Sequence, residues 1–290
     1  MTRRDFLPAL ATAAAAPAAS AGAIDAHTHF YDPARPQGVP WPPRADAILY
    51  RTTLPARLRQ LAEPLGVSGT VVIEASPWLE DNQWLLDLAK DEPFIVGVAG
   101  NLDPGAAEFA RHLERFARNR RFRGIRVNAR RLAEGMAQPA FLAGMDRLAG
   151  LDLELDAVGG PEMFPPLLRL NDRLPRLRVV IDHLPFDPPV DRAAMRELGG
   201  RAAVFAKVSW ILRRRGERVP VDVESYRPAL DDVWAAFGPD RVLYGSNWPV
   251  SDRFAPYAAV HRIAADYFNA KGPAAAARYF RENSRAAYRW

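Results

Sequence analysis

The sequence predicts a single (β/α)8 barrel, the TIM-barrel fold of the α/β class. Eight short β-rich runs alternate with helical patterns along the chain. A barrel of this kind needs about 250 residues, which the chain provides without a linker that would divide it. An open doubly wound sheet is the alternative, but no glycine-rich phosphate-binding turn follows any of the expected strands.

The expected strands are short runs rich in aliphatic and β-branched residues. They lie at Ile24–Phe30, Gly69–Ala75, Phe94–Asn101, Gly124–Asn128, Leu151–Ala157, Arg178–His183, Val204–Ser209 and Arg241–Ser246. Apolar residues at helical spacing predict helices between most of them, at Leu54–Leu65, Asn82–Lys90, Ala106–Arg118, Phe141–Ala149 and Tyr226–Phe237. Strand–helix–strand units of this type connect right-handed, so we expect a parallel sheet.

The composition is typical of a globular enzyme with a large core. Of 290 residues, 49% are hydrophobic and 25% are charged. The chain has no cysteine, which excludes disulfides and thiolate metal sites. The formal charge of +5 comes almost entirely from arginine, and no nucleic-acid recognition motif accompanies it. We therefore expect a small-molecule substrate and no nucleic-acid partner, and no membrane partner once the leader is removed.

Residues 1–23 resemble an export signal of the twin-arginine type. Arg3 and Arg4 precede Phe6-Leu7 and an alanine-rich run, and small residues at Ala16-Pro17-Ala18 and Ala21-Gly22-Ala23 offer cleavage sites. A disordered alanine-rich tail is the alternative. The pattern predicts a protein of the periplasm or cell exterior whose folded domain spans 24–290.

In a (β/α)8 barrel, the reactive residues lie at the carboxyl ends of the strands. His27 and His29 are two residues apart at the end of the first expected strand, so their imidazoles share one face. His112 and His261 fall on helical stretches and are interpreted as surface or packing residues. Other polar side chains at strand ends are Glu74, Ser76, Arg126, Asn128, Glu154, Asp156, Asp182, His183, Lys207, Ser209, Ser246 and Asn247.

Six segments occur in an order typical of one superfamily. They are Asp25-Ala26-His27-Thr28-His29-Phe30, Gly124-Ile125-Arg126-Val127-Asn128, Val180-Ile181-Asp182-His183, Lys207-Val208-Ser209, Tyr244-Gly245-Ser246-Asn247-Trp248-Pro249 and the closing run 282–288. Through them the chain resembles the amidohydrolase superfamily. It is most similar to the amidohydrolase-related branch that includes sugar-lactone hydrolases and the pyrone-dicarboxylate lactonase.

This resemblance implies a role for the three strand-end histidines. His27, His29 and His183 would hold one divalent ion, zinc or manganese, or would polarise the substrate carbonyl directly. Glu74 would be a further ligand or a base, or else a buried hydrogen-bonding partner of the histidines. Lactonases of the same branch work without an ion, so a metal-free mechanism stays open.

Arg126 is the expected substrate-recognition residue, because its planar fork binds a carboxylate with two hydrogen bonds. The alternative is an ion pair with an acid at the barrel mouth such as Glu154 or Asp156. Further side chains expected to contact substrate, or else to be structural, are Ser76, Asn128, Lys207, Trp78 and Trp248.

Asn247 departs from the pattern of the family. The resemblance places an aspartate there, as metal ligand and as the base that activates water, and an amide cannot accept a proton at neutral pH. The base would then be a metal-bound hydroxide, Glu74 or His183. The loss of one negative charge beside Arg126 and Lys207 favours an anionic substrate.

Three functions follow as hypotheses. The first is an exported hydrolase that opens a lactone or related cyclic ester of a small anionic or sugar-derived substrate. The second is a metal-dependent decarboxylase, and the third is a degenerate barrel that binds a ligand without hydrolysing it. Specificity would lie in loops such as Pro33–Tyr50 and Phe186–Asp191, and neither the substrate nor the oligomeric state follows from the sequence.

Overall fold

Eight parallel strands surround a common axis, each hydrogen-bonded to the next in chain order. The computed structural model describes residues 22–186 and 192–290. Backbone hydrogen bonds complete the ring: Asn247 N donates to His27 O and His29 N donates to Trp248 O, both at 2.9 Å. The strands are β1 (Ala23–Thr28), β2 (Val67–Ile73), β3 (Ile95–Gly100), β4 (Phe122–Asn128), β5 (Glu154–Val158), β6 (Val179–Leu184), β7 (Val204–Val208) and β8 (Val242–Tyr244).

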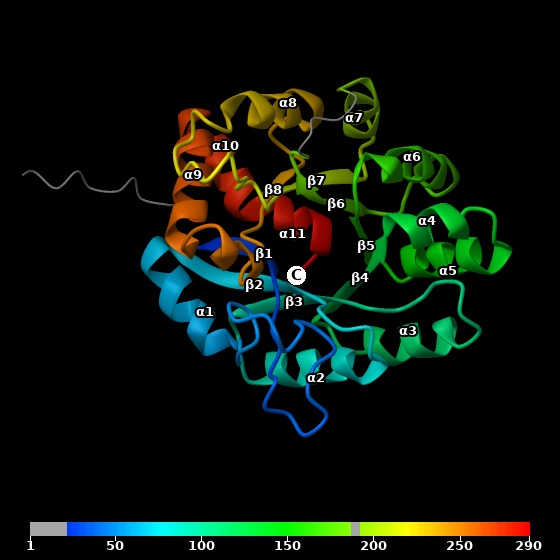
Figure 1. Ribbon diagram of the computed structural model, residues 1–290. Helices are drawn as coiled ribbons and strands as arrows, with labels where there is room; N and C mark the ends of the chain where they lie inside the picture. The colour runs from blue at the N-terminus through cyan, green and yellow to red at the C-terminus, as the bar shows by residue number, and fades with distance from the viewer. Residues whose placement is uncertain (1–21, 187–191) are drawn as a thin grey trace, which may run out of the picture.

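Helices form an outer ring around these strands (Figure 1). They are α1 (Pro55–Ala62), α2 (Leu79–Lys90), α3 (Phe109–Ala117), α4 (Ala129–Gly135), α5 (Pro139–Gly150), α6 (Phe164–Arg173), α7 (Arg192–Gly199), α8 (Arg227–Phe237), α9 (Tyr257–Ala270) and α10 (Pro273–Ala277). A last helix, α11 (Asn283–Tyr288), does not belong to this outer ring. Short 3-10 turns lie at Glu63–Leu65, Pro161–Met163 and Val250–Arg253, and a π-helical turn, η4, spans Arg278–Glu282. Proline occupies the first turn of α1, α5, α6, α8 and α10, where the missing N–H would have no helical acceptor.

The predicted single-domain (β/α)8 barrel is confirmed, and each expected strand is present. The observed ends of the strands differ from the expected ends by a few residues. The fifth strand begins at Glu154 and not at Leu151, because the chain turns at Leu151 and Asp152 after α5. The eighth is shorter than expected, since only Val242–Tyr244 has strand geometry.

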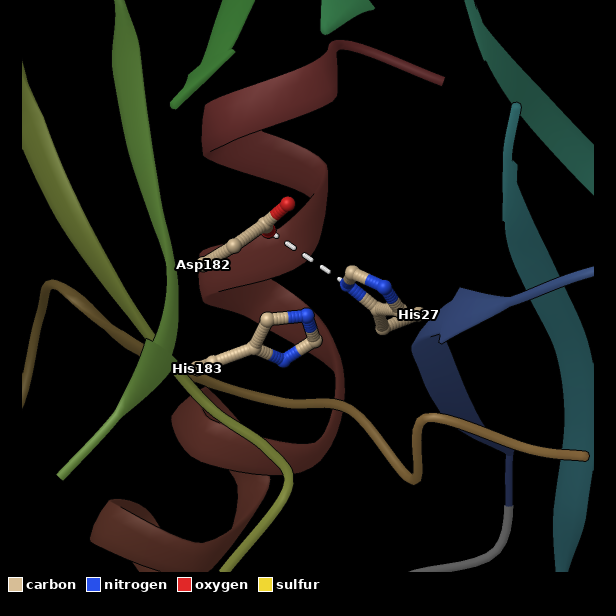
Figure 2. A group of neighbouring side chains, drawn as sticks. All are labelled: His27, Asp182 and His183. Atoms are coloured by element: carbon tan, nitrogen blue, oxygen red, sulfur yellow. Dashed lines mark ion pairs between the residues drawn. The ribbon is translucent and has the colours of Figure 1, made fainter. Parts of the chain in front are cut away.

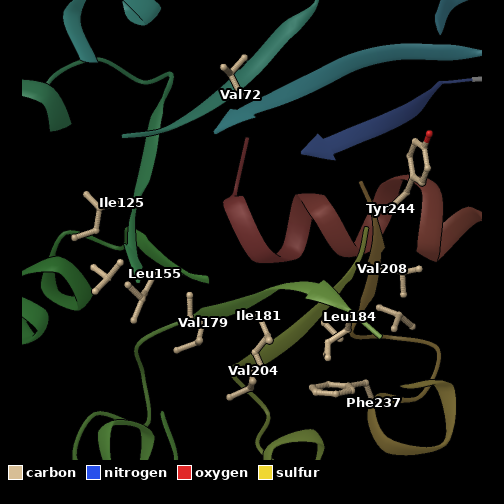
Figure 3. Close-up of a cluster of buried hydrophobic side chains, with 14 of the residues drawn as sticks. Val72, Ile125, Leu155, Val179, Ile181, Leu184, Val204, Val208, Phe237 and Tyr244 are labelled. Carbon is tan, nitrogen blue, oxygen red and sulfur yellow. The ribbon is translucent and has the colours of Figure 1, made fainter. Parts of the chain in front are cut away.

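Apolar side chains fill two layers. The larger layer lies between the strands and the helices, and Figure 3 shows part of it, with Ile125, Leu155 and Val179 pointing away from the axis. The smaller layer fills the barrel interior with Ile24, Ala26, Val71, Ile73, Ala99, Val180, Phe205, Leu243, Ala287 and Tyr288.

Helix α11 closes the end of the barrel at which the strands begin. It lies in the middle of the ring in Figure 1. Arg178, just before β6, donates from Nε to Ala287 O at 2.7 Å, and Arg281 hydrogen-bonds to Gly22 O before β1. A ligand therefore has to enter from the opposite end, where the strands finish.

Two expectations fall largely outside the described residues. Of the export signal expected over 1–23, only the last two residues belong to the described part of the chain. Of the loop expected over 186–191, only Phe186 does. Ala23 already belongs to β1, so the folded barrel begins one residue earlier than expected. Among the described residues, no helix is long and apolar enough to cross a membrane.

Candidate active site

A cavity of about 320 Å³ opens at the carboxyl ends of the strands. This volume suits one small-molecule ligand. The cavity is lined by His29, Trp41, Glu74, Ala75, Ser76, Pro77, Asn101, Arg126, His183, Trp210, Asn247 and Val250.

Strained backbone is concentrated around this cavity. His183, Trp210 and Asn247 have φ angles of 66°, 48° and 58°, in the left-handed region that non-glycine residues rarely adopt. They make up three of the five such residues in the described parts of the chain. Strain of this kind costs about 1–3 kcal/mol per residue and is typical of functional sites.

His27, Asp182 and His183 form a group that could hold a metal ion (Figure 2). Their ligand atoms lie within 4.8 Å of one another. His27 Nε2 and Asp182 Oδ2 are buried and have no hydrogen-bond partner among the described residues, so both are available as ligands. Two imidazole nitrogens and one carboxylate oxygen are donors that zinc and manganese accept, and the group therefore fits such an ion. Asp182, not His29, completes this trio, which differs from the expected set.

His29 stands beside the metal group. Its ring centroid lies 5.0 Å from that of His27. Its Nδ1 is 3.0 Å from Ile73 O, and because a carbonyl only accepts, Nδ1 carries the proton. His29 Nε2 is therefore a lone-pair acceptor.

Burial keeps the three histidines neutral. It lowers the pKa of His29 to about 4 and that of His183 to about 3, and it holds the pKa of His27 well below 6.5. His183 Nδ1 is 2.8 Å from Ser209 Oγ, a contact that fixes its ring. Neutral imidazole is the form that binds a metal ion.

Lys207, expected to contact substrate, lies inside the barrel and does not line the cavity. Its Nζ donates to Asp156 Oδ1 at 2.8 Å and to Asp182 Oδ1 at 2.7 Å, and it lies 3.3 Å from His27 Nδ1. Burial opposes its charge, but the two aspartates raise the pKa of Lys207 above its ordinary value. Asp156 also accepts a hydrogen bond from Tyr288 Oη at 2.9 Å. Lys207 is thus the counter-ion of two buried carboxylates.

Arg126 lines the cavity but is already paired. Its Nε donates to Glu74 Oε1 and its Nη2 to Glu74 O, both at 2.8 Å. The other carboxylate oxygen of Glu74 accepts from Ser76 N at 3.0 Å. The ion pair weighed as the alternative is therefore present, with Glu74 as the acid in place of Glu154 or Asp156. Nη1 of Arg126 makes no hydrogen bond to any described residue.

Three more of the residues expected to contact substrate lie outside the cavity lining. Asn128 caps α4, accepting from Arg131 N at 2.9 Å, and lines a neighbouring cavity. Trp248 is fully buried, with its ring 6.3 Å from that of Phe30. Trp78 also lies outside the lining.

The aromatic walls are Trp41 and Trp210, which the sequence reasoning missed. Trp210 directly follows Ser209 at the end of the seventh strand, so the strand-end rule could have found it. Trp41 lies in the long loop after β1, where no pattern indicates which side chain faces the cavity. His261 packs against Tyr244, as expected of a packing residue.

Comparisons with known proteins agree with the resemblance. A family model described as amidohydrolase matches residues 24–290. L-fucono-1,5-lactonase of Burkholderia ambifaria is 36% identical over 238 residues, which cover 79% of this chain and 80% of that protein. A zinc-bound amidohydrolase of Burkholderia multivorans superposes with a TM-score of 0.80 at 26% identity, covering 93% of this chain and 99% of that one.

A manganese-bound 5-carboxyvanillate decarboxylase of Novosphingobium aromaticivorans shares the fold, with a TM-score of 0.66 at 16% identity over 94% of this chain and 97% of that one. That likeness concerns the fold alone. The family model spans the whole barrel, and the lactonase of Burkholderia ambifaria exceeds 30% identity over most of both chains. The chain belongs to the amidohydrolase family and is a lactonase-like hydrolase.

Proposed function

We propose that this enzyme opens the ring of a neutral sugar lactone by adding water to its carbonyl carbon, which yields a sugar acid. The observation that carries the proposal is the charge of the cavity. Arg126 and Glu74, the charged pair in its lining, neutralise each other, and His29 and His183 are uncharged. An anionic substrate would find no unpaired cationic side chain among the described lining residues, which favours a neutral substrate over the expected anionic one.

Several side chains are placed to assist attack on a lactone carbonyl. With its proton on Nδ1, His29 has a lone pair on Nε2 that can accept a hydrogen bond from the attacking water and orient it. Arg126 Nη1 and the amide of Asn247 belong to the same cavity and supply donors for the negative charge that develops on the carbonyl oxygen. A divalent ion held by His27, Asp182 and His183 would polarise the carbonyl and acidify water, so the missing strand-eight aspartate would not be required.

The test is hydrolysis of L-fucono-1,5-lactone, followed as acid release with a pH indicator and corrected for spontaneous ring opening. We expect wild-type turnover and a loss of more than about 100-fold in His183→Ala. His112→Ala, a partly exposed histidine on α3, is the matched control and should retain activity. Equal rates for wild type and His183→Ala would refute the proposal.

The two other hypotheses predict different results. A decarboxylase would release CO2 from an aromatic acid such as 2,6-dihydroxybenzoate and leave the lactone intact. A degenerate barrel would hydrolyse nothing until Asn247→Asp restores a carboxylate, whereas a wild type already faster than that variant would exclude degeneracy.

We also propose that the chain is exported by the twin-arginine route. The pair Arg3-Arg4 followed by Phe6-Leu7 supports this. Cleavage should occur before Gly22, because Gly22 N and Ala23 N both donate to Gly66 O at 3.1 Å and Ala23 is buried in β1. N-terminal sequencing of periplasmic protein tests this, and Arg3→Lys with Arg4→Lys should keep the protein in the cytoplasm.

A further inference from the structure

We infer that Trp41 and Trp210 form two aromatic walls that select a sugar ring, and that Trp210 is a specificity-determining residue. This inference rests on the proposed function and names how the same cavity recognises its substrate class. The two indoles stand at either end of the histidine cluster: Trp41 contacts His29, and Trp210 contacts His183. A ligand above the histidines is therefore flanked by both walls.

Trp210 is exposed where a core tryptophan would be covered. Its exposed fraction is 40%, although it lies two residues after the end of β7 and its ring centroid is 5.3 Å from that of His183, at an interplanar angle of 85°. Its backbone φ of 48° lies in the left-handed region, which carries a conformational cost for a tryptophan. Arg213 supports it, with the guanidinium 5.6 Å from the ring centroid and a hydrogen bond to Trp210 O. A large exposed apolar side chain with such contacts at a cavity rim is typical of a binding surface.

Trp41 is fixed from the opposite side of the histidines. Its ring lies 5.3 Å from Tyr31 at 80° and 5.8 Å from His29 at 66°. Tyr31 is itself held by the loop after β1, since its hydroxyl donates to Leu49 O at 2.8 Å. The loop thereby presents one ordered indole to the cavity.

The combination of walls and polar groups indicates a sugar ring. Indole faces match the C–H groups of a pyranose ring, and ring hydroxyls can pair with Ser76, Asn101 and Asn247 in the same lining. A lactone without hydroxyls would leave those polar groups unpaired, and such sites reject analogues strongly. The walls and the amides together favour a hydroxylated six-membered lactone.

The experiment compares Trp210→Ala and Trp210→Phe with wild type on L-fucono-1,5-lactone and δ-valerolactone. Trp78→Ala is the matched control, because Trp78 is 38% exposed and follows β2 but does not line the cavity. We expect Trp210→Ala to raise KM for the sugar lactone about tenfold with a much smaller change in kcat, Trp210→Phe to lie between, and Trp78→Ala to match wild type. Circular dichroism checks that all variants fold.

The outcomes separate this inference from the proposed function. An unchanged KM in Trp210→Ala, or an equal rise in Trp78→Ala, overturns the inference while leaving the hydrolase intact. If wild type hydrolyses no lactone, the proposed function fails and calorimetric titration of the intact sugar lactone tests the walls alone. Binding to wild type that is weakened about tenfold in Trp210→Ala then supports them, and no binding to wild type overturns them.

Discussion

Replacing Lys207 with methionine should destabilise the barrel more than any exposed lysine substitution. The ammonium of Lys207 contacts Asp156 at 2.8 Å and Asp182 at 2.7 Å, and all three side chains are fully buried. Methionine keeps the length of the side chain but removes the charge. Two carboxylates would then remain in a low-dielectric interior without their cation, an unfavourable arrangement.

The magnitude follows from these contacts. Removing one partner of a buried ion pair costs about 3–5 kcal/mol, and here one ammonium serves two carboxylates, so we expect the upper end, about 5 kcal/mol. For a domain of this size each kcal/mol moves Tm by about 2–4 °C, which gives a fall of about 10–20 °C. Lys271→Met is the matched control: its ion pair with Asp231, at 3.2 Å, is half-exposed and contributes less than about 1 kcal/mol.

The loss of stability in Lys207→Met should depend on pH. Burial and the neighbouring Asp182 raise the pKa of Asp156 to about 7 even with Lys207 present, and loss of the lysine raises it further. A carboxyl with a raised folded-state pKa is easier to accommodate once protonated, so the penalty declines as pH falls through that value. The deficit of Lys207→Met should therefore be larger at pH 8 than at pH 5.

Calorimetric unfolding of wild type, Lys207→Met and Lys271→Met at pH 8 and pH 5 measures both effects. A Tm of Lys207→Met equal to that of Lys271→Met at pH 8 would refute the ion-pair argument. A deficit that grows toward acid pH would refute the assignment of charged carboxylates at Asp156 and Asp182.

Three further predictions concern the site and its supports. Asn247→Asp should bind zinc more tightly than wild type, because it adds a carboxylate to the cavity at a left-handed backbone position that aspartate tolerates. Chelator competition measures the zinc affinity, and an unchanged affinity would place residue 247 outside the metal site. Asp182→Asn should lower zinc affinity by more than about tenfold in the same assay, and no loss would exclude Asp182 as a ligand. Burial raises the pKa of Asp25 from 3.8 to about 6, so its contribution to stability falls by about 3 kcal/mol as pH rises through that interval. Urea unfolding should show Asp25→Asn gaining about that much on wild type between pH 4 and pH 8, and a constant difference would contradict the shift.

The barrel fold and the positions of the strand ends could be predicted from the sequence because both follow from local patterns. Apolar runs placed each strand to within a few residues, and the carboxyl-end rule then placed His29, His183 and Asn247 at one cavity. Partners across the barrel do not leave such a pattern. Glu74 and Arg126 are 52 residues apart, and only the folded ring brings their side chains together.

The same limit explains why Lys207 was expected to contact substrate although it pairs with two buried aspartates. A lysine at a strand end has the same local signature whether it faces a ligand or a buried aspartate, because alternation along the strand gives the face but not the neighbour. Asp156 and Asp182 come from the two preceding strands, β5 and β6. Their convergence on one ammonium depends on the relative shift of three strands, which sequence periodicity does not contain.

One hydrogen-bonded path joins the closed end of the barrel to the candidate metal group. Tyr288 on α11 donates to Asp156, Lys207 contacts Asp156 and Asp182, and Asp182 lies 3.3 Å from His27 Nδ1. Lys207 and Asp182 compete for that nitrogen: a donating ammonium requires the proton on Nε2, whereas an accepting carboxylate requires it on Nδ1. Only the second arrangement leaves His27 Nε2 free as a metal ligand. With an ion bound, Asp182 would therefore have two roles, with Oδ2 as a ligand and Oδ1 as the group that selects the tautomer of His27.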